Sequence, residues 1–103
     1  MAWEDINVDD YGWVGKLTLK QDSVAVDISS YTAWVYILKD PAGTIASKVA
    51  AFDTDGTDGV LAYTILTGDI DSVGNWTVQA RISKVGSELT ADPLEFNVAA
   101  RID

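Results

Sequence analysis

Apolar and polar side chains alternate without a break from residue 75 to residue 83. One set consists of Trp76, Val78, Ala80 and Ile82, and the other consists of Asn75, Thr77, Gln79, Arg81 and Ser83. Because successive side chains of a β-strand point to opposite faces, this period of two predicts a strand that is buried on one face. Glycine and aspartate residues at 68–74 precede it, as in a tight turn that returns the chain into a β-sandwich. The segment therefore indicates an all-β fold.

The rest of the chain favours the same fold class. Two prolines and eight glycines punctuate a sequence rich in Val, Ile, Thr and aromatic residues. No segment keeps a helical period over three turns, and residues 40–43, Asp-Pro-Ala-Gly, are typical of a turn. We expect one domain with seven or eight strands, at about residues 13–20, 24–28, 31–39, 44–52, 60–66, 75–83 and 93–102.

The alternation also predicts which side chains face the core. These are Trp13, Gly15, Leu17 and Leu19; Val24, Val26 and Ile28; Trp34, Tyr36 and Leu38; Leu61, Tyr63 and Ile65; and Leu94, Phe96, Val98, Ala100 and Ile102. On the strand at residues 31–39, Ala33, Val35 and Ile37 then face outward. An exposed apolar stripe is an interface or an aggregation risk, unless a loop or the N-terminal arm covers it.

Charge and missing residue types exclude several classes of function. The 103 residues include sixteen acidic and seven basic ones, for a formal net charge of −9. Nucleic-acid binding depends on Lys and Arg at phosphates, and anionic membranes attract basic segments, so we expect neither as a partner. Without Cys or His, the chain lacks thiolate nucleophiles, imidazole bases and the commonest zinc ligands. We expect a non-enzymatic protein whose acidity serves solubility or a basic partner.

The sequence contains no apolar run near the roughly 20 residues that a transmembrane helix needs. Residues 1–5, Met-Ala-Trp-Glu-Asp, lack the basic and apolar regions of a signal peptide. We therefore expect a protein that is made in the cytoplasm and is not exported by the general route.

Four segments resemble small phage immunoglobulin-like domains. Residues 25–29, Ala-Val-Asp-Ile-Ser, and 34–44, an apolar strand with a proline–glycine turn, are similar to their first half. Residues 55–64 and 71–79, an acidic glycine loop before a strand and a glycine–aromatic step into the next, are similar to their second half. The nearest group is the N-terminal domain of the baseplate upper protein type. The resemblance implies a fold and a place in a virion, but no catalytic residues.

Carboxylates offer two candidate sites. Asp53, Asp55 and Asp58 could supply oxygen ligands to calcium, although the spacing departs from the EF-hand loop and the same residues suit a plain turn. Asp69 and Asp71 could form an acid–base pair, but we expect them to cap the turn before Trp76.

Aromatic residues suggest a second class of function. Trp3, Tyr11, Trp13, Tyr31 and Trp34 could form a platform that stacks on sugars. Their phase places Trp13 and Trp34 in a core instead, whereas Trp3 and Tyr11 are less well explained by one. A carbohydrate-binding or adhesion module is therefore the alternative function.

We expect an N-terminal arm or edge strand at residues 1–10 and an immunoglobulin-like antiparallel β-sandwich at residues 11–103. The expected role is a phage capsid decoration protein or a tail or baseplate accessory that binds other virion proteins or further copies of itself. Trp3 and Tyr11, together with Ala33, Val35 and Ile37, are the expected partner-binding residues. No cofactor is expected, with calcium as the weaker alternative.

Overall fold

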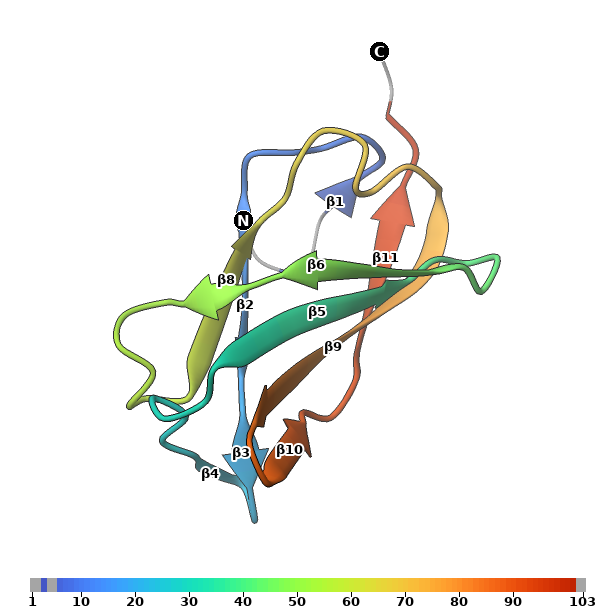
Figure 1. The fold of residues 1–103 in the computed structure, drawn as a ribbon. Helices are drawn as coiled ribbons and strands as arrows, with labels where there is room; N and C mark the ends of the chain where they lie inside the picture. The colour runs from blue at the N-terminus through green and yellow to red at the C-terminus, as the bar shows by residue number, and fades with distance from the viewer. Residues whose placement is uncertain (1–2, 4–5, 102–103) are drawn as a thin grey trace.

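A computed structural model describes Trp3 and residues 6–101, and these residues form eleven β-strands and no helix (Figure 1). The strands are β1 (Ile6–Asn7), β2 (Val14–Thr18), β3 (Lys20–Gln21), β4 (Val24–Ala25), β5 (Ala33–Lys39), β6 (Ile45–Val49), β7 (Ala51–Phe52), β8 (Val60–Thr64), β9 (Gly74–Lys84), β10 (Ser87–Thr90) and β11 (Leu94–Ala99). In this part of the chain, nothing forms a helix of the length and hydrophobicity that crossing a membrane requires. The expected all-β class is confirmed, with more and shorter strands than expected.

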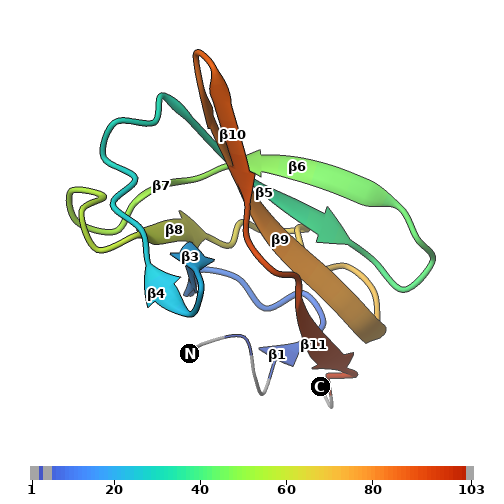
Figure 2. The same cartoon turned by 90° about the horizontal axis from the view of Figure 1, so that it is seen from below.

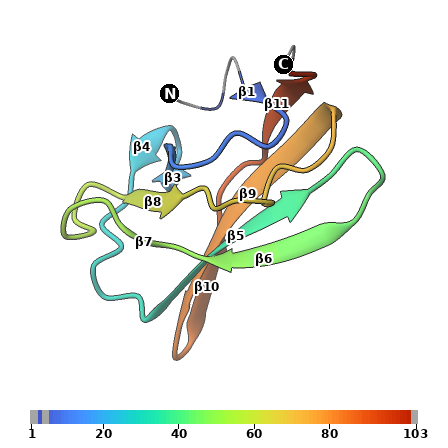
Figure 3. The same cartoon turned by 90° about the horizontal axis from the view of Figure 1, so that it is seen from above.

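The larger sheet has the order β1-β11-β9-β5-β6, and β10 pairs with the far end of β9. The long strand β9, which was predicted from its alternation, is central, and it pairs with β5, β10 and β11. Figure 3 shows β6 at the outer margin of this sheet, beyond β5 and β9. One pair departs from the expected antiparallel arrangement, because β1 runs parallel to β11.

The smaller sheet has the order β2-β8-β7, and β3 and β4 form a separate hairpin. Figure 2 shows that hairpin and β8 on the side of the molecule away from β6. The chain crosses from the larger to the smaller sheet at Ala50, which is buried and donates its backbone N–H to Trp34 O (3.1 Å). The expected strand at residues 44–52 is thus divided between two sheets.

The core lies between the two sheets, and alternate residues of the strands fill it. Tyr36 and Leu38 of β5 are buried, as are Trp76, Val78, Ala80 and Ile82 of β9, and Trp13, Leu19 and Leu61 of the opposite side. The Tyr36 hydroxyl donates to Leu61 O (2.8 Å) and lies 3.0 Å from Gly15 O, so it joins the two sheets. The predicted inner faces of β5 and β9 are confirmed.

Three predicted core residues are solvent-exposed. Val24 lies in the short β3–β4 hairpin, which extends beyond the two sheets, and Ala100 follows the end of β11. Leu94 starts β11 at the open side of the sandwich, where it lines a groove with Leu17. Ile102 lies outside the described residues. The prediction of burial was wrong for Val24, Leu94 and Ala100, because no opposing strand covers these ends of the strands.

Side-chain hydrogen bonds stabilise the turn before β9. Trp76 donates its Nε1–H to Ser72 O (2.9 Å) and stacks on Phe96 at 6.1 Å. Asp69 accepts hydrogen bonds from the Tyr63 hydroxyl (2.6 Å) and Leu66 N (2.8 Å). Asp69 therefore caps this turn, as expected.

Candidate protein-binding surface

The outer face of the larger sheet is apolar where β5 and β6 lie side by side. Val35 is opposite Val49, and Lys39 is opposite Ile45. Because opposite residues share a face, these side chains and Ile37 point away from the core that holds Tyr36 and Leu38. Ile45 and Val49 are 62% and 79% exposed, whereas Val35 and Ile37 are half-buried. We call Val35, Ile37, Ile45 and Val49 the outer stripe.

Polar residues of β9 border the outer stripe. Arg81 is opposite Val35, and Gln79 is opposite Ile37. Arg81 Nε lies 3.8 Å from Glu88 Oε1 of β10, and both side chains are exposed, so this pair adds little stability. An apolar centre with a polar rim is the common arrangement of a protein interface.

The three strands around the outer stripe come from the longest stretches of the chain without acidic residues. The three longest segments free of Asp and Glu are residues 28–39, 41–52 and 72–87. They contain β5, β6 and β9, which are neighbours in the larger sheet (Figure 1). In a chain of net charge −9, the outer face of these three strands therefore lacks acidic side chains, and its charged groups are the basic residues Lys39 and Arg81.

Ala33, Val35 and Ile37 lie together on the outer face of β5, as predicted from the sequence. Ile45 and Val49 were not among the predicted partner-binding residues. The turn at residues 40–43 could have revealed them, because it fixes the register of β6 on β5.

Trp3 packs against its own domain and does not project as a free anchor. Its ring lies 5.2 Å from the Trp13 ring and 5.1 Å from the Phe96 ring, and its Nε1–H donates to Lys16 O (3.0 Å). The neighbouring Ile6 of β1 is almost completely buried. Of the two expected alternatives, an arm or an edge strand, residues 6 and 7 form the edge strand β1, and Trp3 is a partly buried aromatic residue packed on the core rather than a free anchor.

Tyr11 is exposed in the connection between β1 and β2. The outer stripe belongs to β5 and β6, so Tyr11 is not part of it. The structure thus separates the five predicted partner-binding residues into a group on β5 and two residues elsewhere.

The three aspartates proposed for calcium are engaged in the loop itself. Asp53 forms an ion pair with Lys16 (3.1 Å). Asp55 accepts hydrogen bonds from Thr57 N and Oγ1, which lower the pKa of its carboxyl group, and Asp58 accepts one from Val60 N (3.1 Å). Within residues 3 and 6–101, no group of three or more acidic side chains is placed to hold a metal ion. The loop has the hydrogen bonds of ordinary aspartate turns.

The aromatic residues do not form a platform. Trp13 and Tyr31 are buried, Trp34 packs against Phe52 with ring centroids 4.7 Å apart, and Trp3 lies against the core. Of the five rings proposed for sugar stacking, only that of Tyr11 is largely exposed. A stacked sugar needs an open ring face, so this set of residues does not supply the expected site.

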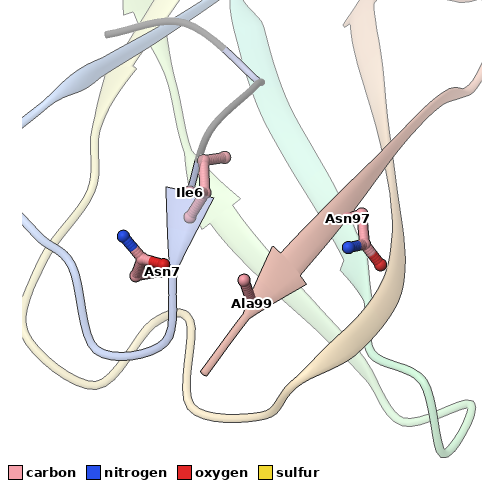
Figure 4. A pocket seen from close by; sticks show the side chains of 4 residues that line it. All are labelled: Ile6, Asn7, Asn97 and Ala99. Carbon is pink, nitrogen blue, oxygen red and sulfur yellow. The ribbon is translucent and has the colours of Figure 1, made fainter. Parts of the chain in front are cut away.

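A shallow hollow lies beside β1 and β11, lined by Ile6, Asn7, Asn97 and Ala99 (Figure 4). The Asn7 and Asn97 amides stand on either side of Ala99 and offer hydrogen-bond donors and acceptors. Neither a charged group nor an aromatic ring is among these lining residues. The hollow therefore offers a ligand two amide side chains and little else. We take the outer stripe as the better candidate surface.

Comparison with protein-family models and with curated proteins finds no match for this chain. A functional proposal therefore depends on the fold and on the surfaces described above. Among these surfaces, the outer stripe combines exposed apolar side chains, two paired strands and a lack of acidic residues.

Proposed function

We propose that this chain is a non-enzymatic, immunoglobulin-like structural domain of a phage virion, and that it binds other proteins through the outer stripe. The observation that carries the proposal is the exposure of Ile45 and Val49 beside Val35 and Ile37 on one face of the larger sheet. Single exposed apolar side chains are normal, but a contiguous group on a rigid sheet is typical of an interface.

Strand order supports the immunoglobulin-like part of the proposal. The neighbours β11-β9-β5-β6 match strands G, F, C and C′ of a variable-type domain, and β2-β8-β7 match strands B, E and D. Trp76 begins the strand that corresponds to F, and its Nε1–H returns to the backbone at Ser72. That contact resembles the tyrosine corner, in which an aromatic side chain at the same place bonds to the upstream backbone.

The resemblance of the sequence to phage immunoglobulin-like domains supports a virion protein as the partner. A capsid, tail or baseplate protein with an uncharged, apolar patch would fit the outer stripe. The many acidic residues outside this face would then disfavour wrong orientations by repulsion.

A charge placed on the stripe tests the proposal. Val35→Lys puts an ammonium group at the centre of the contact, so we expect it to lower the recovery of the protein with purified capsid, tail or baseplate proteins at least tenfold. The matched control is Val85→Lys, since Val85 is fully exposed in the β9–β10 turn and lies off the stripe. Equal co-purification of both variants and the unchanged protein would overturn the proposed surface.

A second result would favour the alternative function. If the protein binds a cell-wall polysaccharide and Val35→Lys has no effect on that binding, the carbohydrate-binding module replaces the virion contact. Asn7→Ala and Asn97→Ala would then show whether the hollow of Figure 4 is the sugar site.

A further inference from the structure

Strand β6 leaves one backbone edge without a partner strand in the described part of the chain. The bonds Ala50 N to Trp34 O (3.1 Å) and Asp40 N to Thr44 O (3.0 Å) show that even-numbered residues of this hairpin bond to one another. Since backbone groups alternate in direction along an antiparallel strand, the N–H and C=O groups of Ile45, Ser47 and Val49 point away from β5. These are also the residues whose side chains are exposed on the outer face.

Of the features that usually discourage strand pairing, this edge has one, the inward-pointing charge of Lys48. It spans five residues without proline, and its outward side chains are uncharged. Its one charged residue, Lys48, points inward and pairs with Asp69 Oδ1 at 3.1 Å. The edge therefore presents backbone groups and apolar side chains together to a second strand.

The sequence of β6 is complementary to itself. In an antiparallel pair centred on Ser47, Ile45 lies opposite Val49 of the second copy at both ends, and the two Ser47 residues face each other. This register pairs all five residues and forms two β-branched cross-strand contacts. Lys48 lies opposite Ala46 of the second copy, so no like charges meet.

We propose that two copies of this chain associate through antiparallel pairing of their β6 edges, around a two-fold axis at Ser47. Because β6 is the last strand of the larger sheet, the two larger sheets then become one continuous sheet, and the two outer stripes join at the axis. The pairing rests on the proposed function in one respect, since both use the outer stripe as a contact surface. The occupant of the β6 edge is a second copy of this chain. Val35 and Ile37 lie one strand away from the pairing edge and stay available to a virion protein.

Net charge opposes the association of two copies, but the β6 segment adds no acidic side chain to that repulsion. Two molecules of net charge −9 repel each other, and residues 41–52 contain no acidic residue. A basic partner would instead be attracted to the acidic surfaces elsewhere. At this edge two copies can therefore meet without bringing acidic side chains of the paired strands together.

The variant Ser47→Pro tests the free edge of β6 and leaves the hydrogen bonds between β5 and β6 in place. The Ser47 N–H points outward, so Ser47→Pro removes a donor to the second copy but no bond to β5. Sedimentation of the unchanged protein over a range of concentrations should show a dimer, and Ser47→Pro should sediment as a monomer. A wild-type protein that is monomeric at every concentration, or a Ser47→Pro variant that remains fully dimeric, would overturn the pairing.

Hydrogen exchange gives a test that needs no substitution, should the proline variant fail to fold. The amides of Ile45, Ser47 and Val49 should exchange quickly in dilute protein and at least tenfold more slowly in concentrated protein. The amides of Ala46 and Lys48, which face β5, should be protected at both concentrations. Rapid exchange of the outward amides in a demonstrated dimer would overturn this edge as the interface.

A single thiol tests the register, because the chain contains no cysteine. Ser47→Cys should form a covalent dimer under mild oxidation, since the two residues at the axis face each other. Val85→Cys is the control for random collision, because its side chain is more exposed. Equal cross-linking at the two positions would contradict the two-fold register.

The outcomes separate this proposal from the proposed function. If Ser47→Pro is monomeric and still binds a virion protein that Val35→Lys does not bind, both proposals stand. If the unchanged protein is monomeric but binds that virion protein, only the self-pairing fails. If it dimerises through β6 but Val35→Lys binds virion proteins normally, only the proposed function fails.

Discussion

Trp3 shows how one residue can determine the packing of an open edge of the sandwich. Its ring fills the space over Gly15, between Trp13 and Phe96, and its Nε1–H satisfies the outward carbonyl of Lys16. A Cβ atom added at Gly15 would lie 2.6 Å from Trp3 Cη2 and 2.8 Å from Trp3 Cε2. Gly15 is therefore required by the tryptophan above it rather than by its backbone conformation.

We expect Gly15→Ala to lower the free energy of unfolding by about 1–3 kcal/mol, because the added methyl group displaces the Trp3 ring. In a Trp3→Ala background, the same change should cost much less, since the clash is gone. Denaturant unfolding of the wild type, both single variants and the double variant measures the coupling. Additive effects of the two changes would mean that Gly15 is constrained by something other than Trp3.

The position of Trp3 could not be predicted from the sequence. The segment around it is short and lacks an alternating pattern of apolar and polar residues. The contacts of Trp3 therefore depend on how the edges of the two sheets meet. Trp76, by contrast, was placed correctly because eight neighbouring residues repeat the same alternation.

At the scale of strands, Asp69 connects three elements. Its carboxylate accepts hydrogen bonds from Tyr63 of β8 and from the backbone of the following turn, and it pairs with Lys48 of β6. The side chain is only 6% exposed. Burial by itself raises the pKa of this carboxyl group, but the bonds from Tyr63, Leu66 and Lys48 outweigh it and hold the pKa below its ordinary value of 3.8.

This lowered pKa predicts a pH-dependent stability. Because the folded state favours the ionised carboxylate, its stabilisation is fully present above about pH 4 and is lost as the pH falls through the folded-state pKa. Asp69→Asn should lower the free energy of unfolding by about 1.5–3 kcal/mol at pH 7 and should remove this part of the acid sensitivity. The measurement is denaturant unfolding between pH 7 and about pH 2.

The exposed Asp71 provides the control, since Asp71→Asn makes the same change of charge two residues away. We expect Asp71→Asn to alter stability by no more than about 0.5 kcal/mol. An equal loss in both variants would indicate a general effect of charge rather than the three bonds at Asp69.

Strands with many alternating residues were predictable, whereas their distribution between sheets was not. The alternation at residues 31–39 and the Asp40–Gly43 turn predicted β5 and its hairpin partner. Nothing at Ala50 indicates that the chain leaves one sheet for the other there, because a small residue in an apolar segment suits either sheet. The outer stripe was therefore predicted on β5 and missed on β6.

At the scale of the whole molecule, the net charge acts differently on self-association and on binding to a basic partner. The chain carries −9 overall, while β5, β6 and β9 come from its acid-free segments. Contact between two copies through β6 brings two like net charges together, and only the short-range strand contacts favour it. Contact with a basic partner would instead be favoured by the net charge itself.

Salt should therefore strengthen self-association. Raising the ionic strength from about 10 mM to about 150 mM shortens the Debye length from about 30 Å to about 8 Å, so repulsion between the two copies falls. We expect the dimer dissociation constant from sedimentation equilibrium to fall several-fold, while Ser47→Pro stays monomeric at both ionic strengths. A dimer that weakens as salt is added would be held by opposite charges, and the uncharged β6 edge could not be its interface.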